Sequence, residues 1–145
     1  MKEFVEVKII SAVKGLLTGR VNEILDDVPF SIPSIEFTNY DGASSTVPEV
    51  RLVSCESGEK ERIVRQDVYL LTVSFSVPQS PESGLFCFAY AHALCRAVRE
   101  NPALGGAADR VVVAGKKYVY PKTPYKGEAE GLAVTLRVTV EGAGL

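Results

Sequence analysis

The stretch that decides the fold is VYLLTVSFSV (residues 68–77). Large apolar side chains occupy every second position from Tyr69 to Val77, and hydroxylated side chains occupy the alternate positions from Thr72 to Ser76. This alternation predicts a β-strand with one buried face, because successive side chains of a strand point to opposite faces. Residues 132–140 (LAVTLRVTV) repeat the pattern. A sheet with one face in a hydrophobic core is therefore the centre of the predicted fold.

A charged hairpin is predicted to lead into this strand. Residues 49–55 alternate and are rich in valine and leucine, and residues 56–59 (ESGE) form a turn into a long strand over residues 60–77. The base of the hairpin is apolar, whereas its far end is charged. This composition is typical of an arm that projects from the body. The residues that we assign to the far end are Arg51, Lys60, Glu61, Arg62 and Arg65.

Two shorter segments, residues 34–37 and 110–113, also read as strands, which makes about five in all. Turn-forming residues fill 39–48 (NYDGASSTVP), which we interpret as a loop. Residues 116–131 are interpreted as a long loop or an irregular hairpin end.

An amphipathic helix is predicted from Val5 to about Asp26, where apolar residues recur at steps of three and four. The helix must end before Pro29, because the residue that precedes a proline is pushed out of the helical region. Gly15 and Gly19 lie near its polar side and indicate a bend or a close neighbour.

A second helix is predicted to begin with a cap at Ser80 and Pro81 and to run to about Glu100, where Asn101–Pro102 stops it. Its apolar arc is wider than one face of a sheet usually covers. The first helix or another subunit must cover the excess. The polar side is a narrow strip that holds His92, Arg96 and Arg99.

These elements predict an α+β fold in the order α-β-β-β-α-β-β. A small, mainly antiparallel sheet of about five strands carries both helices on one face, because adjacent strands without helical crossovers favour antiparallel pairing. The 145 residues fit a single domain over 1–145, and the composition, 46% hydrophobic and 23% charged, is that of a globular protein.

Composition also argues against several functional classes. The formal net charge of −2 gives no general attraction to nucleic acids or anionic membranes. No apolar run approaches the ~20 residues that span a bilayer, and the N-terminus does not resemble a signal peptide. Cys55, Cys87 and Cys95 are an odd, widely spaced set. We expect free thiols in a reducing compartment, with Cys87 buried in the second helix.

Candidate catalytic and metal-binding groups are weak. His92 and Cys95 are three residues apart on a helix, which permits a thiolate–imidazole pair, but no third group that would orient them can be identified. Cys87 and His92 lie ~140° apart around the helix and cannot share a metal ion. Gly105–Gly106 precedes a strand rather than a helix, so it is not a phosphate-binding loop. We expect no catalytic residue, metal or cofactor.

The most distinctive local composition is KKYVYPKTPYK (residues 116–126). Lysines interleaved with tyrosines are compatible with single-stranded nucleic acid, but tyrosine is also enriched at protein contacts, and acidic residues follow at once. We favour a protein contact. The full set of predicted contact residues is Arg51, Arg62, Arg65, His92, Arg96, Arg99, Lys116, Lys117, Tyr118 and Tyr120.

The order of the elements, together with the run ENPALGGAADRV (residues 100–111), resembles the tail-terminator and minor tail proteins of long-tailed bacteriophages and prophages. In that family a helix commonly ends in an acid or asparagine, a proline, any residue, a leucine and two glycines, and then leads into a strand. The motif covers only about ten residues, whereas the order of elements covers most of the chain.

The resemblance implies a structural protein of the virion tail, assembled in the host cytoplasm as a ring of typically six copies. Such a ring closes the tail tube, so the implied partners are other copies of the chain, the tail-tube protein and a head-completion protein. The family has no catalytic residues to carry over. A tail-completion or head–tail joining protein is the alternative, and an enzyme using Cys95 with His92 or a nucleic-acid-binding module is more remote.

Overall fold

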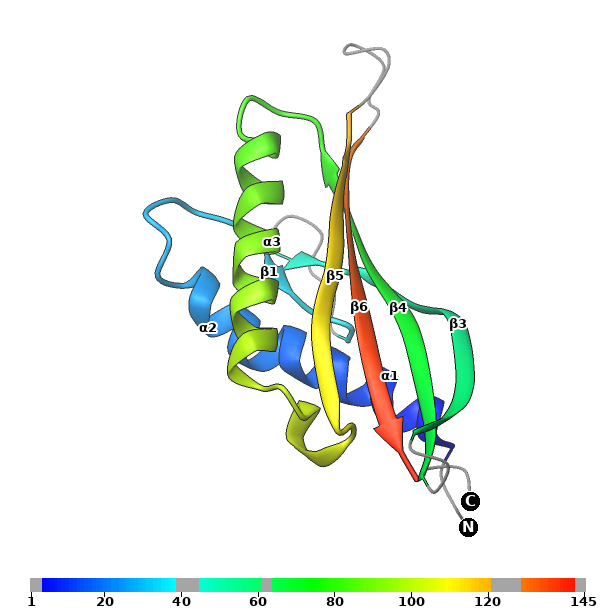
Figure 1. Cartoon of the computed structure of the whole chain (residues 1–145). Helices are drawn as coiled ribbons and strands as arrows, with labels where there is room; N and C mark the ends of the chain where they lie inside the picture. Colours follow the sequence, from blue (N-terminus) through cyan, green and yellow to red (C-terminus); the bar gives the residue numbers. More distant parts are fainter. Residues whose placement is uncertain (1–3, 39–44, 61–63, 121–128, 143–145) are drawn as a thin grey trace.

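A computed structural model describes residues 4–38, 45–60, 64–120 and 129–142 (Figure 1). Four long strands form an antiparallel sheet in the order β3-β4-β6-β5. The bounds are β3 (Glu49–Lys60), β4 (Val64–Pro78), β5 (Arg110–Val119) and β6 (Ala129–Glu141). The second helix, α3 (Ser83–Glu100), runs along the strands, whereas α1 (Val5–Leu16) runs across them (Figure 1).

The predicted α+β class is confirmed, as is the sheet with one buried face. The apolar positions of residues 68–77 and 132–140 are buried under the helices, while the positions between them form the uncovered face. Burial therefore follows the alternation read from the sequence. The largest of the fully buried side chains include Tyr90, Ile9, Leu17, Ile35, Leu71, Leu94, Leu132 and Leu136.

The predicted strand at residues 34–37 belongs to a second, smaller sheet. Only Ser34–Ile35 (β1) is extended, and it pairs in parallel with Ser45–Thr46 (β2). The interpretation of residues 39–48 as loop is therefore wrong at Ser45–Thr46, while residues 39–44 lie outside the described part. The main sheet has four strands rather than five, because β1 and β2 pair with each other.

The hairpin turn was predicted too early. Residues 56–59 do not turn the chain but continue β3, which pairs with β4 as far as Lys60 opposite Val64. Arg51 stands opposite Thr72, well inside the sheet, so its assignment to the far end of an arm is wrong. Backbone hydrogen bonds to β4 extend the ladder without any need for apolar side chains, which is why the polar composition misled.

The interpretation of residues 116–131 as loop is also wrong at both ends. Residues 116–119 belong to β5 and residues 129–131 to β6, where Lys116 pairs with Val134 and Tyr118 with Leu132. Residues 121–128 lie outside the described part. β5 is an edge strand whose backbone pairing tolerates lysine, a residue that blunts the exposed edges of sheets.

The first helix is confirmed, and one of its two glycines lies in a π-helical turn. α1 passes into a π-helical turn, η1 (Leu17–Val21), that contains Gly19, and then into α2 (Asn22–Leu25). A π turn adds a residue to the helical turn, and such turns recur at functional or structurally special positions. Here the turn is followed by Asn22, whose side chain accepts a hydrogen bond from the Ile35 N–H (2.8 Å) and donates one to the Ile35 carbonyl (2.9 Å).

Asn22→Ala should therefore destabilise the chain by about 1–3 kcal/mol, because both backbone groups of the buried Ile35 lose their partner. Urea unfolding monitored by circular dichroism measures the change. Thr18→Ala is the matched control, since the Thr18 hydroxyl is exposed and bonds only to its own helix. Equal losses for the two variants would contradict this role for Asn22.

The turn after α3 aligns the helix with β5. Gly105 and Gly106 have φ values of 64° and 97°, in the region that favours glycine, as two adjacent glycines had suggested. The Val111 N–H donates to the Pro102 carbonyl (2.7 Å), which ties the start of β5 to the end of α3. As a result, the last turn of α3 and the first residues of β5 lie side by side (Figure 1).

Candidate functional site

The first turn of α3 is held by Glu130 on β6, a residue that the sequence did not single out. The helix begins at Ser83, three residues after Ser80, and none of its first N–H groups is capped by its N-cap residue, Glu82. Instead, the fully buried Ser83 hydroxyl donates to the Glu130 carboxylate on β6 (2.7 Å). A carboxylate here also complements the positive end of the helix dipole. The start of α3 is thereby fixed against the sheet.

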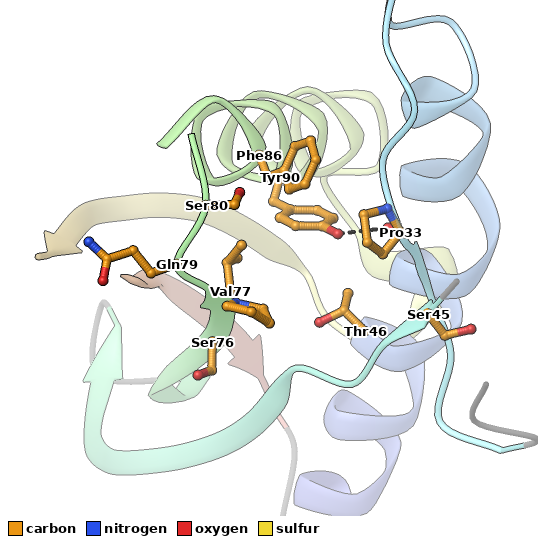
Figure 2. A pocket seen from close by; sticks show the side chains of 10 residues that line it. Pro33, Ser45, Thr46, Ser76, Val77, Gln79, Ser80, Phe86 and Tyr90 are labelled. Carbon is orange, nitrogen blue, oxygen red and sulfur yellow. Dashed lines mark hydrogen bonds between the residues drawn. The ribbon is translucent and has the colours of Figure 1, made fainter. Parts of the chain in front are cut away.

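Tyr90 anchors the middle of α3. Its ring stacks on Phe75 with centroids 4.8 Å apart, and its hydroxyl donates to the Pro33 carbonyl (2.7 Å). Burial, with a smaller effect of Cys87, raises the pKa of the Tyr90 phenol well above its usual range. Tyr90 also borders a cavity of about 330 Å³ with Pro33, Thr46 and Phe86 (Figure 2). The short β1–β2 sheet is thus tied to the helix.

The predicted burial of Cys87 is confirmed, and the three free thiols differ in exposure. Burial raises the pKa of Cys87 to about 11, with a smaller contribution from Glu130. We expect the exposed Cys55 to react first with a thiol reagent near pH 8, the half-buried Cys95 more slowly, and Cys87 only after unfolding, because the thiolate is the reactive form. Stopped-flow titration with and without urea measures the order. Fast labelling of Cys87 in the folded chain would contradict the packing of α3.

The outer face of α3 keeps an uncovered apolar surface. Leu85 and Phe88 are 47% and 51% exposed, and Tyr120, just after β5, is 62% exposed. Tyr118 contacts Phe88 edge-on, with ring centroids 5.4 Å apart. We call Leu85, Phe88, Tyr118 and Tyr120 the aromatic patch. The first helix and the sheet cover most of the wide apolar arc of α3, but they leave this part to solvent.

A bulge in β5 decides which side chains face α3. The register of β5 against β6 shifts between Val113 and Gly115, and an extra residue reverses the side to which the following side chains point. Lys116 therefore lies on the helix side of the sheet with the inward-facing Val134 as its partner, whereas Lys117 lies on the open face. The predicted lysine–tyrosine stretch is thus split between two faces in its described part.

Below the aromatic patch, a groove of about 510 Å³ runs between α3 and β5. Three cations border it: Arg99 from the helix, Lys116 from the helix side of β5, and Arg110 from the start of β5, where its register partner Thr139 lies on the open face of the sheet. All three are exposed. Among the described residues, none of those that line the groove is acidic. We call this the basic groove; its other walls include Cys95, Val111 and Val113.

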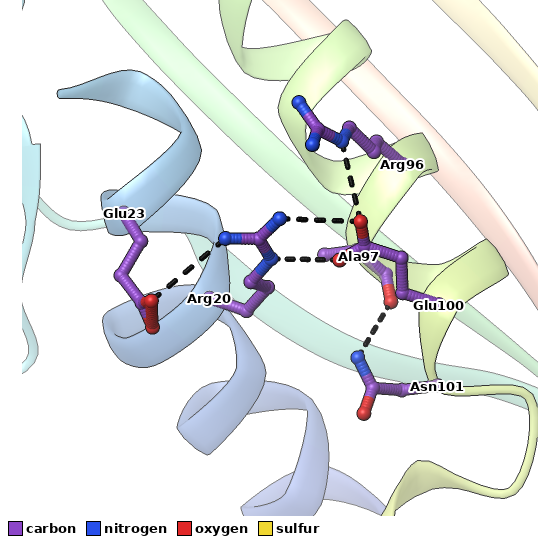
Figure 3. Close-up of polar contacts among 6 residues, drawn as sticks. All are labelled: Arg20, Glu23, Arg96, Ala97, Glu100 and Asn101. Atoms are coloured by element: carbon purple, nitrogen blue, oxygen red, sulfur yellow. Dashed lines mark hydrogen bonds and ion pairs between the residues drawn. The ribbon is translucent and has the colours of Figure 1, made fainter. Parts of the chain in front are cut away.

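The other predicted contact residues lie elsewhere. Arg96 is bound by Glu100 (3.3 Å), and the same carboxylate accepts two hydrogen bonds from Arg20 on η1, at 2.7 and 3.2 Å (Figure 3). His92 is exposed on the outer face of α3, and Arg51 pairs with Glu49 (3.0 Å) on the open side of the sheet. Arg62 and the side chain of Arg65 lie outside the described part. The predicted contact set thus does not form one surface.

The Arg20 hydrogen bond lowers the pKa of the Glu100 carboxyl, with Arg96 adding to the effect. A carboxyl with a lowered folded pKa stabilises the fold above its unfolded pKa, and this contribution is lost as the pH falls through the folded value. We therefore expect Glu100→Gln to reduce the acid sensitivity of unfolding below about pH 4.3, the ordinary glutamate value. The urea unfolding midpoints of the wild-type chain and the variant, compared from acid to neutral pH, measure this change. An unchanged acid limb would contradict the pairing.

Sequence reasoning identified Arg99, Lys116, Tyr118 and Tyr120 but not Arg110. Arg110 carried a weak signal, since it is the next-to-last residue of the glycine-containing run that resembles tail proteins. Within the described residues, no cluster of three or more His, Cys, Asp or Glu side chains could hold a metal ion. None of the helices in that part of the chain has the length and apolar character needed to cross a bilayer.

Comparison of the chain with known proteins finds no matching family model and no similar curated protein.

Proposed function

We propose that the chain is a structural protein of a bacteriophage or prophage tail, the terminator that assembles as a ring, closes the tail tube and joins it to the head. The observation that carries the proposal is the aromatic patch on α3 and β5. It supports a role in assembly because exposed aromatic side chains that cluster on a rigid element are typical of protein interfaces. The run of residues 100–111, which resembles tail proteins, ends at the opposite end of the same two elements, where Val111 lines the groove between α3 and β5.

Rigid elements on both sides hold the patch in place. The hydrogen bond between Ser83 and Glu130 fixes the start of α3, and that of Tyr90 fixes its middle. The stretch of helix that carries Leu85 and Phe88 is therefore held in place on the sheet. A preorganised surface loses less conformational entropy on association than a flexible one. The patch therefore suits a contact that must form repeatedly and identically around a ring.

Deletion of the gene from the phage or prophage that carries it tests the proposal. Electron micrographs of the lysate should show tails of abnormal length and heads without tails, and a plasmid copy of the gene should restore normal particles. Normal tails joined to heads in the absence of the gene would exclude the terminator function.

A further inference from the structure

The two sides of α3 carry opposite charge. Glu23 on α2 and Asp26 and Asp27 just after it are all exposed, and we call these three residues the acidic helix end. The basic groove lies on the β5 side of α3, whereas α2 lies on the other side (Figure 1). One copy of the chain therefore cannot bring its own acidic helix end into its own basic groove.

The fold itself does not account for the acidic helix end. Asp26 and Asp27 follow the C-terminal end of a helix, where the dipole disfavours negative charge. Arg20 lies 3.8 Å from Glu23 but is held more closely by Glu100, at 2.7 Å (Figure 3). Arg20, whose charge also acts on Glu23 and Asp27, therefore offsets only part of the negative charge of the acidic helix end. Asp26 and Asp27 in addition lie where the helix dipole disfavours negative charge.

Among the described residues, no ion pair offsets the three cations of the basic groove. Arg99 lies in the last turn of α3, where the dipole favours a cation, but Arg110 and Lys116 come from β5 and gain nothing from it. The apolar walls formed by Val111 and Val113 lower the local dielectric, which strengthens any ion pair made there. The groove is thus built to receive negative charge.

We propose that the basic groove of one copy receives the acidic helix end of the next copy, so that copies of the chain join head to tail. The contact itself does not depend on the proposed function; only the ring that such contacts would build rests on it. Three positive side chains meet three negative ones, and complementary charge fixes register and rejects wrong partners. Because the two surfaces differ, the contact is heterologous and closes into a ring when the rotation permits.

A charge-swap experiment tests the contact on the full-length chain by sedimentation velocity over a concentration series at low ionic strength. The groove variant is Arg99→Glu with Arg110→Glu and Lys116→Glu, and the helix-end variant is Glu23→Lys with Asp26→Lys and Asp27→Lys. Each alone should weaken self-association about tenfold or more, because like charges then face each other. Mixing the two, or combining all six substitutions in one chain, should restore association. Circular dichroism establishes that each variant is folded.

Lys117→Glu on the open face is the matched control and should leave association unchanged. A wild-type chain that does not self-associate, variants that associate normally, or a mixture that fails to recover would each overturn the contact. If the groove variant instead loses binding to a single-stranded oligonucleotide while self-association is unchanged, the groove's occupant is nucleic acid and the proposal is wrong. If the charge swap fails but deletion of the gene gives abnormal tails, only the proposed contact is rejected. If the charge swap restores association but deletion leaves the tails normal, only the tail function is rejected.

Discussion

Replacing Tyr90 with alanine should lower the free energy of unfolding by about 3–5 kcal/mol. Tyr90 is a fully buried side chain that packs on Phe75 and bonds the Pro33 carbonyl, so its loss leaves a cavity and an unpaired acceptor. Tyr90→Phe is the matched control, because it keeps the ring and removes only the hydroxyl. It should cost about 0.5–3 kcal/mol, depending on whether water reaches the orphaned carbonyl.

Urea unfolding with fluorescence and circular dichroism measures both variants. The order of the two losses is the essential result. If Tyr90→Ala cost no more than Tyr90→Phe, the stacked ring would contribute nothing, and α3 would not be anchored to the sheet as described.

Replacing Phe88 with serine should weaken self-association by about 2 kcal/mol or more, since aromatic side chains at the centre of an interface often carry that much binding energy. The fold should survive, because Phe88 is half exposed and loses only its edge contact with Tyr118. That contact is worth about 0.5–1.5 kcal/mol.

Phe4→Ser is the matched control, because Phe4 is 75% exposed but lies before α1, outside the aromatic patch. Sedimentation equilibrium of the three proteins at the same ionic strength gives the association constants. Equal weakening by both substitutions would show that exposed apolar area in general, rather than the aromatic patch, drives association.

The sequence predicted the strands and helices that have one face in the core, but it did not predict the full length of the strands at the edges of the sheet. Residues 68–77 and 132–140 alternate because one face of β4 and β6 contacts the helices, and that burial imposes a period of two on the side chains. Residues 56–60 and 116–119 are also strands, but they belong to the two edge strands and lack a clear alternation of polar and apolar residues, so the sequence pattern does not identify them. The pairing of β1 with β2 depends on side chains distant in sequence, such as Asn22.

The sequence predicted most of the residues that border the groove between α3 and β5, but it did not predict that they lie close together. Arg99 and Lys116 were expected contact residues, yet only the bulge in β5 brings Lys116 to the helix side of the sheet. The turn at Gly105 and Gly106 then brings the start of β5, which carries Arg110, next to the end of α3, which carries Arg99. Arg51, by contrast, lies well inside the sheet and not at the end of an arm, because β3 and β4 remain paired past it as far as Lys60. Such positions depend on register, which a single sequence does not reveal.

Native mass spectrometry of the purified chain, with electron micrographs of the same sample, tests the central claim of head-to-tail assembly most directly. We expect a closed oligomer of one copy number, six by the resemblance to tail terminators, seen as rings. A chain that stays monomeric across the concentration series, or that stops at a symmetric dimer, would contradict this account.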